Sequence, residues 1–363
     1  MCENKSVLVG MSGGVDSSVT VGILQDAGYS VQGLTITPFK IDEKCKVEEG
    51  AKSCCNQKSM LDAMEIARKF GIEHYLVDMT GEFEKTIVKN FVDEYLAGRT
   101  PNPCVLCNPM IKWKALINKA DSLGCRYVAT GHYAKIRYDE NLKKNVLCKA
   151  VDQNKDQTYF LWRLTSEELN RSLFPLGNLT KPETRQLAAK YELIVKDKPD
   201  SQEICFVPDN DYRHFLENYL KQSITNPGDF VLHGKPFGKH HGFANYTVGQ
   251  RKGLGVSYSE PLYVKKIDAE NNIIELDTIE NISFKSLQAN DVNLCKYTNL
   301  DSEKLYSVKI RYRDQGSLAK CKIQGGKLFV EFQKAKNSIA PGQSVVIYEG
   351  DDVVGGAVIE SAE

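Results

Sequence analysis

Short apolar runs alternate with amphipathic segments over the first 135 residues of the chain. The apolar runs predict buried strands at residues 7–11, 31–36, 74–77 and 126–130. The segments between them space their apolar side chains as on one face of a helix, and they predict helices at residues 17–27, 57–70, 84–96 and 110–123. This alternation predicts an α/β fold, with a Rossmann-like parallel sheet covered by helices on both faces.

The pattern changes past residue 225, where short β-branched and aromatic runs are separated by Gly, Pro, Asn and Asp, as at Gly325 and Gly326. Such a texture predicts strands joined by tight turns. A last helix at residues 212–220 indicates a boundary nearby, and a second boundary near residue 285 divides the β part in two. We therefore predict an α/β domain, a small central β domain and a C-terminal β-barrel, over residues 1–215, 216–285 and 286–363.

With 363 residues, the chain is long enough for two or three separate hydrophobic cores. Its 47 basic residues balance its 47 acidic ones, which excludes a globally basic nucleic-acid binder but allows a local basic patch. No apolar segment near the N-terminus is long enough for a signal peptide or a membrane span, so we expect a cytoplasmic protein with no membrane partner. In that compartment the 11 cysteines are expected to be thiols rather than structural disulfides.

The sequence Ser-Gly-Gly-Val-Asp-Ser at residues 12–17 lies between the first expected strand and the first expected helix. Its two glycines let the backbone turn tightly and direct several N–H groups at one anion, which predicts a phosphate-binding loop. It is neither a Walker sequence, which needs Gly-Lys-Ser/Thr, nor a dinucleotide fingerprint, which needs Gly-x-Gly-x-x-Gly. A simple strand-to-helix turn would explain the glycines but not both serines and the aspartate.

Three cysteines stand in segments suited to chemistry. Cys104 and Cys107 form a Cys-x-x-Cys pair, and Cys107 is expected just before the helix at residues 110–123, where a helix N-terminus favours the thiolate. Cys205 lies in a segment bounded by Pro199 and Pro208. Zinc, redox and iron–sulfur interpretations are all open for the Cys-x-x-Cys pair. The cysteines expected to be surface or buried thiols without a chemical role are Cys54, Cys55, Cys125, Cys148, Cys295 and Cys321.

The loop at residues 12–17 resembles the signature of the ATP pyrophosphatases, which split ATP between its α- and β-phosphates and adenylate a substrate. With its other motifs, the chain resembles the bacterial tRNA-specific 2-thiouridylase family over essentially its whole length. The motifs that carry this resemblance occur in the family's order. They are Gly-Met-Ser-Gly-Gly-Val-Asp-Ser at residues 10–17, Asn-Pro at 102–103 with Cys-Asn at 107–108, Thr-Gly-His-Tyr-Ala at 130–134, Lys-Asp-Gln-Thr-Tyr-Phe at 155–160, Ser-Gln-Glu-Ile-Cys-Phe at 201–206 and Thr-Val-Gly-Gln-Arg-Lys-Gly-Leu-Gly at 247–255.

The resemblance implies a tRNA-uridine 2-sulfurtransferase that uses ATP with Mg²⁺ to adenylate O2 of the wobble uridine, position 34, and gives 2-thiouridine, AMP and pyrophosphate. It implies an ATP pyrophosphatase domain over residues 1–215 and a tRNA-contacting barrel over residues 286–363. Cys107 is the implied nucleophile, Cys205 the implied persulfide carrier, and the two are implied to form a transient disulfide. The implied ATP-binding residues are Gly10, Met11, Ser12, Gly13, Gly14, Val15, Asp16, Ser17, Ile36 and Gly131. The implied target-base residues are Asn102, Pro103 and Cys104, and the implied tRNA-binding residues are His132, Lys155, Asp156, Gln157, Arg311, Tyr312 and Gln343.

Cys104 stands where the family commonly has an aspartate. Either that aspartate is dispensable and the persulfide route operates, or Cys104, Cys107 and Cys205 hold a [4Fe–4S] cluster with one iron open to bind sulfide. We favour the persulfide route. It requires an upstream persulfide donor protein, such as a cysteine desulfurase or a relay protein.

Positive charge gathers between residues 304 and 336, where nine Lys or Arg residues stand against only Asp314 and Glu331. Within this patch Tyr312 lies between two arginines, a pattern suited to phosphate contact and base stacking. An enzyme that modifies C2 of a uracil must take the base out of its stack, so the anticodon stem-loop of the tRNA has to be held firmly. A solvated β face is the alternative interpretation of the patch.

Two other functions are compatible with the loop at residues 12–17. An ATP pyrophosphatase that adenylates a small molecule would use the same loop and leave the cysteines incidental, but no glutaminase domain is visible in the sequence. A tRNA-binding protein with an inactive loop is disfavoured, because Ser12, Asp16, Cys107 and Cys205 are all intact.

Overall fold

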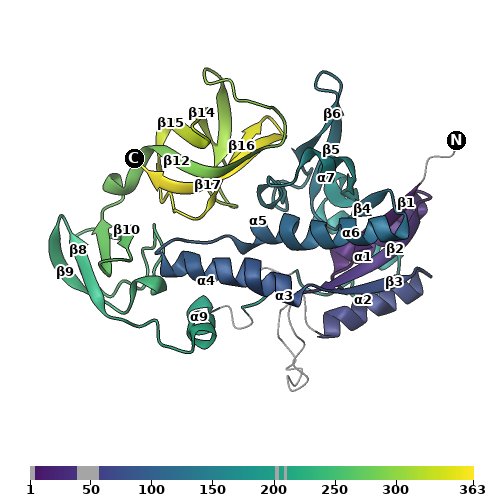
Figure 1. Cartoon of the computed structure of the whole chain (residues 1–363), viewed down its shortest axis with the longest axis horizontal. Helices are drawn as coiled ribbons and strands as arrows, with labels where there is room; N and C mark the ends of the chain where they lie inside the picture. Colours follow the sequence, from purple (N-terminus) through teal and green to yellow (C-terminus); the bar gives the residue numbers. More distant parts are fainter. Residues whose placement is uncertain (1–4, 39–56, 201–203, 208–210) are drawn as a thin grey trace. The chain divides into compact units, whose positions relative to one another are not determined.

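The computed structural model describes residues 5–38, 57–200, 204–207 and 211–363 (Figure 1), so Cys54 and Cys55 lie outside the described residues. The chain divides into two compact units. Unit 1 comprises Met1–Ile87, Cys104–Asn210 and Asp351–Val353, and unit 2 comprises Val88–Pro103, Asp211–Gly350 and Val354–Glu363. The two predicted domain boundaries, near residues 215 and 285, are not tested by this division into two units and stay a prediction.

Unit 1 is built on a five-stranded parallel sheet in the order β3-β2-β1-β4-β7. The strands are β1 (Ser6–Gly10), β2 (Ser30–Thr37), β3 (His74–Asp78), β4 (Tyr127–Ala129) and β7 (Ser172–Leu173). The helices of the sheet are α1 (Val15–Asp26), α2 (Gln57–Lys69), α6 (Lys114–Leu123) and α8 (Lys181–Lys190). The predicted α/β class and parallel sheet are confirmed, and the first four strands begin and end within two residues of their predicted bounds.

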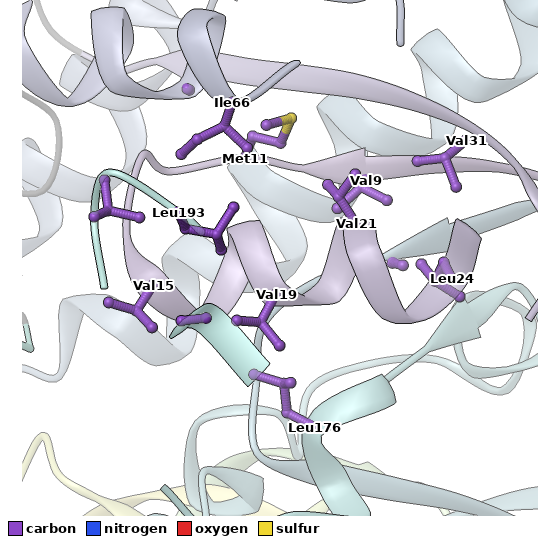
Figure 2. Close-up of a cluster of buried hydrophobic side chains, with 14 of the residues drawn as sticks. Val9, Met11, Val15, Val19, Val21, Leu24, Val31, Ile66, Leu176 and Leu193 are labelled. Atoms are coloured by element: carbon purple, nitrogen blue, oxygen red, sulfur yellow. The ribbon is translucent and has the colours of Figure 1, made fainter. Parts of the chain in front are cut away.

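The core of unit 1 lies between α1 and the sheet (Figure 2). Val9 of β1 and Val19 and Val21 of α1 have no exposed surface, and Ile66 of α2 is almost as fully buried. Burying each such side chain stabilises the fold by roughly 1.5–3 kcal/mol. Because α1 is packed on nearly all sides, its start, and hence the loop before it, is held in a fixed place.

Two further helical stretches contain π-helical turns. The first runs through α3 (Thr80–Phe83), the π-helix η1 (Glu84–Val88) and α4 (Lys89–Leu96). The second runs through α5 (Pro103–Cys107), the π-helix η2 (Asn108–Trp113) and α6. Cys107 has helical dihedral angles of φ −61° and ψ −36° and is the last residue of α5. The expectation that Cys107 lies just before a helix is therefore wrong, because the helical stretch begins at Pro103, about two turns before the predicted start at residue 110.

Unit 1 is completed by a hairpin of β5 (Ala134–Asp139) and β6 (Lys144–Lys149) and by several short helical segments. These segments are η3 (Thr158–Phe160), α7 (Ser166–Asn170) and η4 (Pro175–Asn178). Helix α7 begins with a capping box, in which the Thr165 hydroxyl accepts from the Glu168 N–H and the Glu168 carboxylate from the Thr165 N–H. At the start of α8 the Glu183 carboxylate accepts from the Thr180 N–H and hydroxyl.

Unit 2 contains the helix α9 (Tyr212–Leu220) and two sheets. The smaller sheet has the order β10-β11-β8-β9, from β8 (Gly228–Leu232), β9 (Lys235–His240), β10 (Tyr263–Asp268) and β11 (Ile273–Asp277). The larger sheet runs β12-β15-β14-β13-β16-β17, and pairing of β12 with β17 closes it into a barrel. Its strands are β12 (Ser283–Leu294), β13 (Leu305–Lys309), β14 (Ser317–Gln324), β15 (Lys327–Asn337), β16 (Ser344–Glu349) and β17 (Asp352–Ala362).

The barrel contains a tight glycine turn that the sequence predicts. Gly325 and Gly326 both have positive φ, 59° and 76°, and join β14 to β15 in a two-residue hairpin loop. The predicted mainly-β second half and C-terminal barrel are confirmed. No helix within the described parts of the chain is long and apolar enough to span a membrane.

Candidate functional site

The sheet order of unit 1 creates a topological switch point at β1. This strand lies between β2 and β4, so the chain turns to one side of β1 to form β2 and β3 and to the other side to form β4 and β7. The loop at residues 11–14 follows β1, and Thr130, Gly131 and His132 follow β4. Open parallel sheets bind ligands at the carboxyl edge of such a point. The predicted phosphate loop therefore stands where the fold favours a ligand.

Backbone geometry and serine hydroxyls shape this loop. Gly13 has φ 67°, and a Cβ atom built on it would lie 1.9 Å from the carbonyl oxygen of Ser59, so only glycine fits there. The Ser17 hydroxyl accepts from the Ser12 backbone N–H at 3.1 Å, and the two hydroxyl oxygens lie 3.2 Å apart. Helix α1 begins after Gly14, which has no side chain to cap it. The N–H groups of its first turn are consequently directed at the space that an anion would fill.

The predicted ATP-binding residues outside the loop lie at the same edge of the sheet. Ile36 is half-buried near the end of β2. Gly131 approaches the loop so closely that a Cβ atom on it would lie 2.7 Å from the backbone nitrogen of Ser17. Residues from β1, β2 and the turn after β4 thus lie at the same edge of the sheet as the loop, and their role in ATP binding stays a prediction.

Asp16, the loop's carboxylate, is engaged by Lys181, which the sequence did not single out, and by Tyr133, which lies in the motif at residues 130–134. The Lys181 ammonium lies 2.7 Å from its Oδ1 and 2.9 Å from its Oδ2. The Tyr133 hydroxyl donates to Oδ1 at 3.0 Å. Burial, and then the charge of Asp16, raise the pKa of Tyr133 well above its usual value, so the phenol stays protonated.

Lys181 also pairs with Asp200, at 2.7 Å, and two further cations face that carboxylate. Lys155 lies 2.7 Å and Arg185 3.2 Å from Asp200. Burial is the largest single influence on Asp200 and raises its pKa, but hydrogen bonds and charge from Lys155 and Lys181 together hold the pKa below its usual value. Asp200 is therefore ionised, and the two carboxylates share one buried lysine.

Lys198 ties the loop to α2. Its ammonium donates to the Gly13 carbonyl at 2.9 Å, to the Ser59 hydroxyl at 3.0 Å and to Asp62 at 2.8 Å. Lys181, Lys198 and Asp200 belong to none of the motifs found in the sequence, so spacing along the chain offered no signal for them. Tyr133 lies in the motif at residues 130–134, but no role was assigned to it.

The three cysteines that were predicted to be chemically active differ in exposure. Cys104 is exposed, whereas Cys107 and Cys205 are half-buried, and none of them is in a disulfide. Cys104 and Cys107 stand three residues apart in α5, a spacing that puts them on one helix face. Among the described residues no group of three or more His, Cys, Asp or Glu side chains could hold a metal ion, so the ligand set needed for a cluster is not assembled.

The segments that carry Cys107 and Cys205 are both attached to α3, within unit 1. Lys114, which follows the π-helix after Cys107, pairs with Glu82 of α3 at 2.8 Å. Phe206, next to Cys205, packs edge-on against Phe83, with ring centroids 5.5 Å apart. Glu82 therefore contacts the helical stretch that carries Cys107, and the adjacent Phe83 contacts the segment that carries Cys205. The four isolated cysteines, Cys125, Cys148, Cys295 and Cys321, are buried as predicted.

The Nδ1 atom of His132 lies 2.7 Å from the hydroxyl oxygen of Thr130. The ring packs against Trp113, at 5.7 Å between centroids, and against Phe174, at 6.3 Å. Burial, with a smaller effect of Lys112, lowers the pKa of His132 to about 3. The imidazole is therefore neutral at pH 7, which suits a hydrogen bond to a base rather than an ion pair with a phosphate.

The predicted tRNA-binding run at residues 155–157 makes contacts within unit 1. Lys155 faces Asp200. Asp156 is buried and accepts hydrogen bonds from the Ala150 backbone and from the Thr158 hydroxyl. Gln157 accepts from the Tyr133 N–H at 2.9 Å. These contacts stabilise the turn after β4, and RNA contact by this run stays a prediction.

In unit 2, Gln343 holds the backbone just ahead of the predicted target-base segment. Its side-chain amide donates to the Thr100 carbonyl at 3.0 Å and to the Pro101 carbonyl at 3.2 Å. The Thr100 N–H in turn donates to Pro341 at 2.8 Å. Asn102 is half-buried and Pro103 buried directly after this anchor.

The loop between β13 and β14 presents the predicted arginines. Asp314 is buried and accepts from the Ile310 and Gly316 N–H groups, each at 3.1 Å, and from Lys336 at 2.8 Å. This shapes the loop so that Arg311 and Arg313 are exposed. Elsewhere the basic patch is partly neutralised by glutamates outside it, in the pairs Lys304–Glu349, Lys320–Glu303 and Lys327–Glu360.

Comparison with known proteins gives full-length matches. Residues 5–209 match the family model described as tRNA methyl transferase HUP domain, residues 213–276 the tRNA methyl transferase PRC-barrel domain, and residues 284–359 the aminomethyltransferase beta-barrel domain. The chain is 48% identical to the tRNA-specific 2-thiouridylase MnmA 1 of Caldanaerobacter subterraneus subsp. tengcongensis, over 98% of each chain. It is 46% identical to the MnmA proteins of Salinibacter ruber, over 99% of this chain and 95% of the relative, and of Acetivibrio thermocellus, over 99% and 100%.

Proposed function

The chain belongs to the tRNA-specific 2-thiouridylase family and is a tRNA-uridine 2-sulfurtransferase, and from this premise we propose that it works in the cytoplasm and thiolates the wobble uridine of tRNA with ATP and a cysteine persulfide. The observation that carries the proposal is the phosphate loop at the β1 switch point, in the same compact unit as Cys107 and Cys205.

The first step is adenylation of the substrate base. Uracil O2 attacks the α-phosphate of ATP, the bond to the β-phosphate breaks, and pyrophosphate leaves. N–H groups at the start of α1, after Gly14, stabilise the charge that develops on the phosphates. The product carries AMP on O2, which makes C2 electrophilic.

Asp16 is the residue that would meet a magnesium ion. Mg²⁺ usually takes one or two carboxylates together with substrate phosphates and water, and the single carboxylate of the loop fits that pattern. When bound, the ion neutralises charge on the departing pyrophosphate.

The second step delivers sulfur. The terminal sulfur of a Cys205 persulfide attacks C2 and AMP leaves. The Cys107 thiolate then attacks the inner sulfur of Cys205 and forms a disulfide with it, the bond between the two persulfide sulfurs breaks, and its electron pair stays on the sulfur bound to C2. External thiols then reduce the disulfide, and a donor protein reloads Cys205. The described thiols form no metal-binding group, and each step of this proposal uses the thiols themselves.

The tRNA is held by residues of both units in this proposal. Arg311 and Arg313 contact backbone phosphates, and Tyr312 offers a stacking face. The neutral His132 and the segment from Asn102 to Cys104 contact the extruded base.

One experiment tests the proposal. The protein is purified anaerobically, its iron content is measured, and ATP-dependent 2-thiouridine formation is assayed for the wild type and for Cys104→Ala, Cys107→Ala and Cys205→Ala. We expect iron-free activity that is lost without Cys107 or Cys205 and kept without Cys104. Activity that needs iron and all three cysteines would overturn the persulfide route, and the absence of 2-thiouridine from every preparation would overturn the function itself.

A further inference from the structure

Cys104 has no part in the sulfur chemistry proposed above, although it is the most accessible of the described thiols. Among the seven cysteines in the part of the chain that the structure describes, Cys104 alone is exposed, whereas Cys107 and Cys205 are half-buried. Cys104 also stands where the family commonly has an aspartate, and it forms the Cys-x-x-Cys pair with Cys107. This chain therefore presents an additional thiol beside the predicted nucleophile.

Helix α5 sets the spacing of Cys104 and Cys107. The two residues lie three positions apart within this helix. With a rise of about 1.5 Å per residue on a cylinder of about 2.3 Å radius, the Cα atoms of such a pair are about 5 Å apart. Disulfides join Cα atoms that are roughly 4.4–6.8 Å apart. A bond between Cys104 and Cys107 therefore requires only a local adjustment of α5.

Buried neighbours hold this pair in place. Val105, between the two cysteines, is buried. Asn108, directly after Cys107, is also buried, and its Nδ2 atom donates to the Phe160 carbonyl at 2.8 Å. The backbone is thus fixed beside Cys107 while the Cys104 side chain remains exposed to solvent. Exchange within the pair needs no movement of another element.

The disulfide left by sulfur transfer joins the two less accessible thiols. In the proposed reaction it links Cys107 to Cys205, and Cys205 cannot be reloaded with sulfur until this bond is opened. The rate of thiol–disulfide exchange depends on the access of the attacking thiolate to the disulfide sulfur. A folded reductant has limited access to two half-buried sulfurs, but it can reach an exposed one.

We propose that Cys104 is a resolving thiol, which moves the disulfide from Cys107–Cys205 to Cys104–Cys107. The Cys104 thiol loses its proton to solvent and attacks the Cys107 sulfur. The bond between Cys107 and Cys205 breaks, and its electron pair stays on the Cys205 sulfur, which leaves as a thiolate. The exchange involves no net oxidation or reduction. This inference rests on the proposed function, since that function assigns the disulfide that is resolved.

Two advantages follow from this exchange. Cys205 becomes free to accept a new sulfur before any reductant has arrived. The oxidised pair then lies at the exposed end of α5, where a dithiol reductant supplies two electrons and returns Cys104 and Cys107 to thiols.

The first test locates the disulfide after one round of thiolation. Full-length protein, loaded with persulfide by a cysteine desulfurase and cysteine, receives MgATP and tRNA without reductant. It is then quenched in acid, its free thiols are blocked with N-ethylmaleimide, and its peptides are mapped by mass spectrometry. In the wild type we expect most of the disulfide at Cys104–Cys107, with Cys205 blocked, and in Cys104→Ser all of it at Cys107–Cys205. A wild-type disulfide that stays at Cys107–Cys205, with Cys104 blocked, overturns the inference.

The second test measures recycling by thioredoxin, which is kept reduced by its reductase and NADPH. For each protein the rate of later turnovers is divided by the rate of the first, so that an effect of the substitution on tRNA binding cancels. We expect this ratio to fall about fivefold or more in Cys104→Ser, and also in Cys104→Asp, which restores the family's usual residue but no thiol. A large excess of dithiothreitol should abolish the difference, because a small dithiol reaches the half-buried disulfide directly. An undiminished ratio in both variants with thioredoxin overturns the inference.

The matched control is Met110→Ala, which changes an exposed side chain in the same helical stretch and keeps all three thiols. It should retain the wild-type ratio and the wild-type position of the disulfide. An equal fall in Met110→Ala and Cys104→Ser would show that disturbance of the helical stretch is the cause, and it would refute the resolving role. Wild-type protein that makes 2-thiouridine but keeps the disulfide at Cys107–Cys205 refutes only the resolving role, whereas wild-type protein that makes no 2-thiouridine refutes the proposed function and the resolving role with it.

Discussion

The side-chain amide of Gln343 donates to the backbone carbonyl of Thr100 at 3.0 Å, across 243 positions of sequence. It thereby joins the turn before β16 to the segment that ends at Asn102 and Pro103. Gln343 was predicted to contact tRNA, and the structure gives its amide a second task, which is to hold the backbone of the predicted target-base segment.

Substituting Gln343 by alanine is expected to raise the KM for tRNA about tenfold with little change in kcat for bound substrate. Two hydrogen bonds of roughly 0.5–1.5 kcal/mol each are lost, and the segment ahead of Asn102 must be ordered at the expense of binding energy. Steady-state kinetics with tRNA as the varied substrate measures this. Gln324→Ala, at the exposed end of β14, is the control and should leave the KM unchanged. An equal effect of both variants contradicts the anchoring role.

Gly13→Ala should weaken ATP binding by about tenfold or more, because the residue has φ 67° and its Cβ would meet the Ser59 carbonyl at 1.9 Å. The loop would have to move away from α2. Gly28→Ala is a matched control, since Gly28 has φ 76° but nothing within 4 Å of its Cβ position. We expect that control to cost roughly 1 kcal/mol of stability and to bind ATP normally. The measurement is the equilibrium dissociation constant for ATP of both variants and the wild type, corrected for the fraction of each protein that is folded.

His132 should make the protein less stable in acid. Its pKa is about 3 in the folded state, against an ordinary value of 6.5, so between these values the unfolded chain binds more protons and stability falls as the pH falls. At pH 5.5 the loss relative to pH 7.5 is about 1.4 kcal/mol from this residue alone. His132→Gln should lack that part of the pH dependence. Urea unfolding of both proteins at the two pH values measures it, and identical differences would show that His132 does not titrate this way.

Thiol labelling of the native protein should separate the cysteines by burial. Burial, with a hydrogen bond to Asp352, raises the pKa of Cys148 to about 12, and burial alone raises that of Cys321 to about 12. Both are therefore protonated and inert at pH 8. We expect Cys104, Cys107 and Cys205 to react with iodoacetamide within minutes, and Cys148 and Cys321 only after unfolding. Peptide mass spectrometry reports each site, and rapid native labelling of Cys321 would contradict the barrel core described above.

Arg311 and Arg313 should contribute to tRNA affinity in a salt-dependent way. Replacing either by glutamine removes about one phosphate contact and lowers the slope of log K against log salt concentration by roughly 0.7–0.9. Lys320→Gln is the control, because Lys320 is engaged by Glu303 at 2.7 Å and is expected to change the slope less. The slope is measured by titrating the protein with tRNA at several salt concentrations between about 50 and 200 mM. Equal slopes for all variants would show that the loop between β13 and β14 does not contact tRNA.

Much of the architecture follows from local pattern. The alternation of β-branched runs and amphipathic segments was enough to predict β1, β2, β3 and β4 and the helices beside them, because a strand and a helix bury their faces with periods of about two and 3.6 residues. The π-helical turns at Glu84–Val88 and Asn108–Trp113 were not predictable in this way, since an extra residue in a turn leaves the apolar pattern almost intact. The start of the helical stretch that carries Cys107 was also placed about two turns too late, at residue 110 instead of Pro103.

The candidate site likewise combines features that the sequence predicts with contacts that only the structure shows. The sequence by itself determined which residue types are available and predicted their roles: a glycine-serine loop for phosphate, three cysteines for sulfur, and paired arginines for RNA. Only the tertiary structure decided which side chains meet. Lys181, Lys198 and Asp200 reach the loop because packing of α1 and α8 against one core brings distant positions within 3 Å, and burial then makes their charges interdependent. Such contacts depend on three-dimensional proximity and on local dielectric, neither of which has a period along the chain.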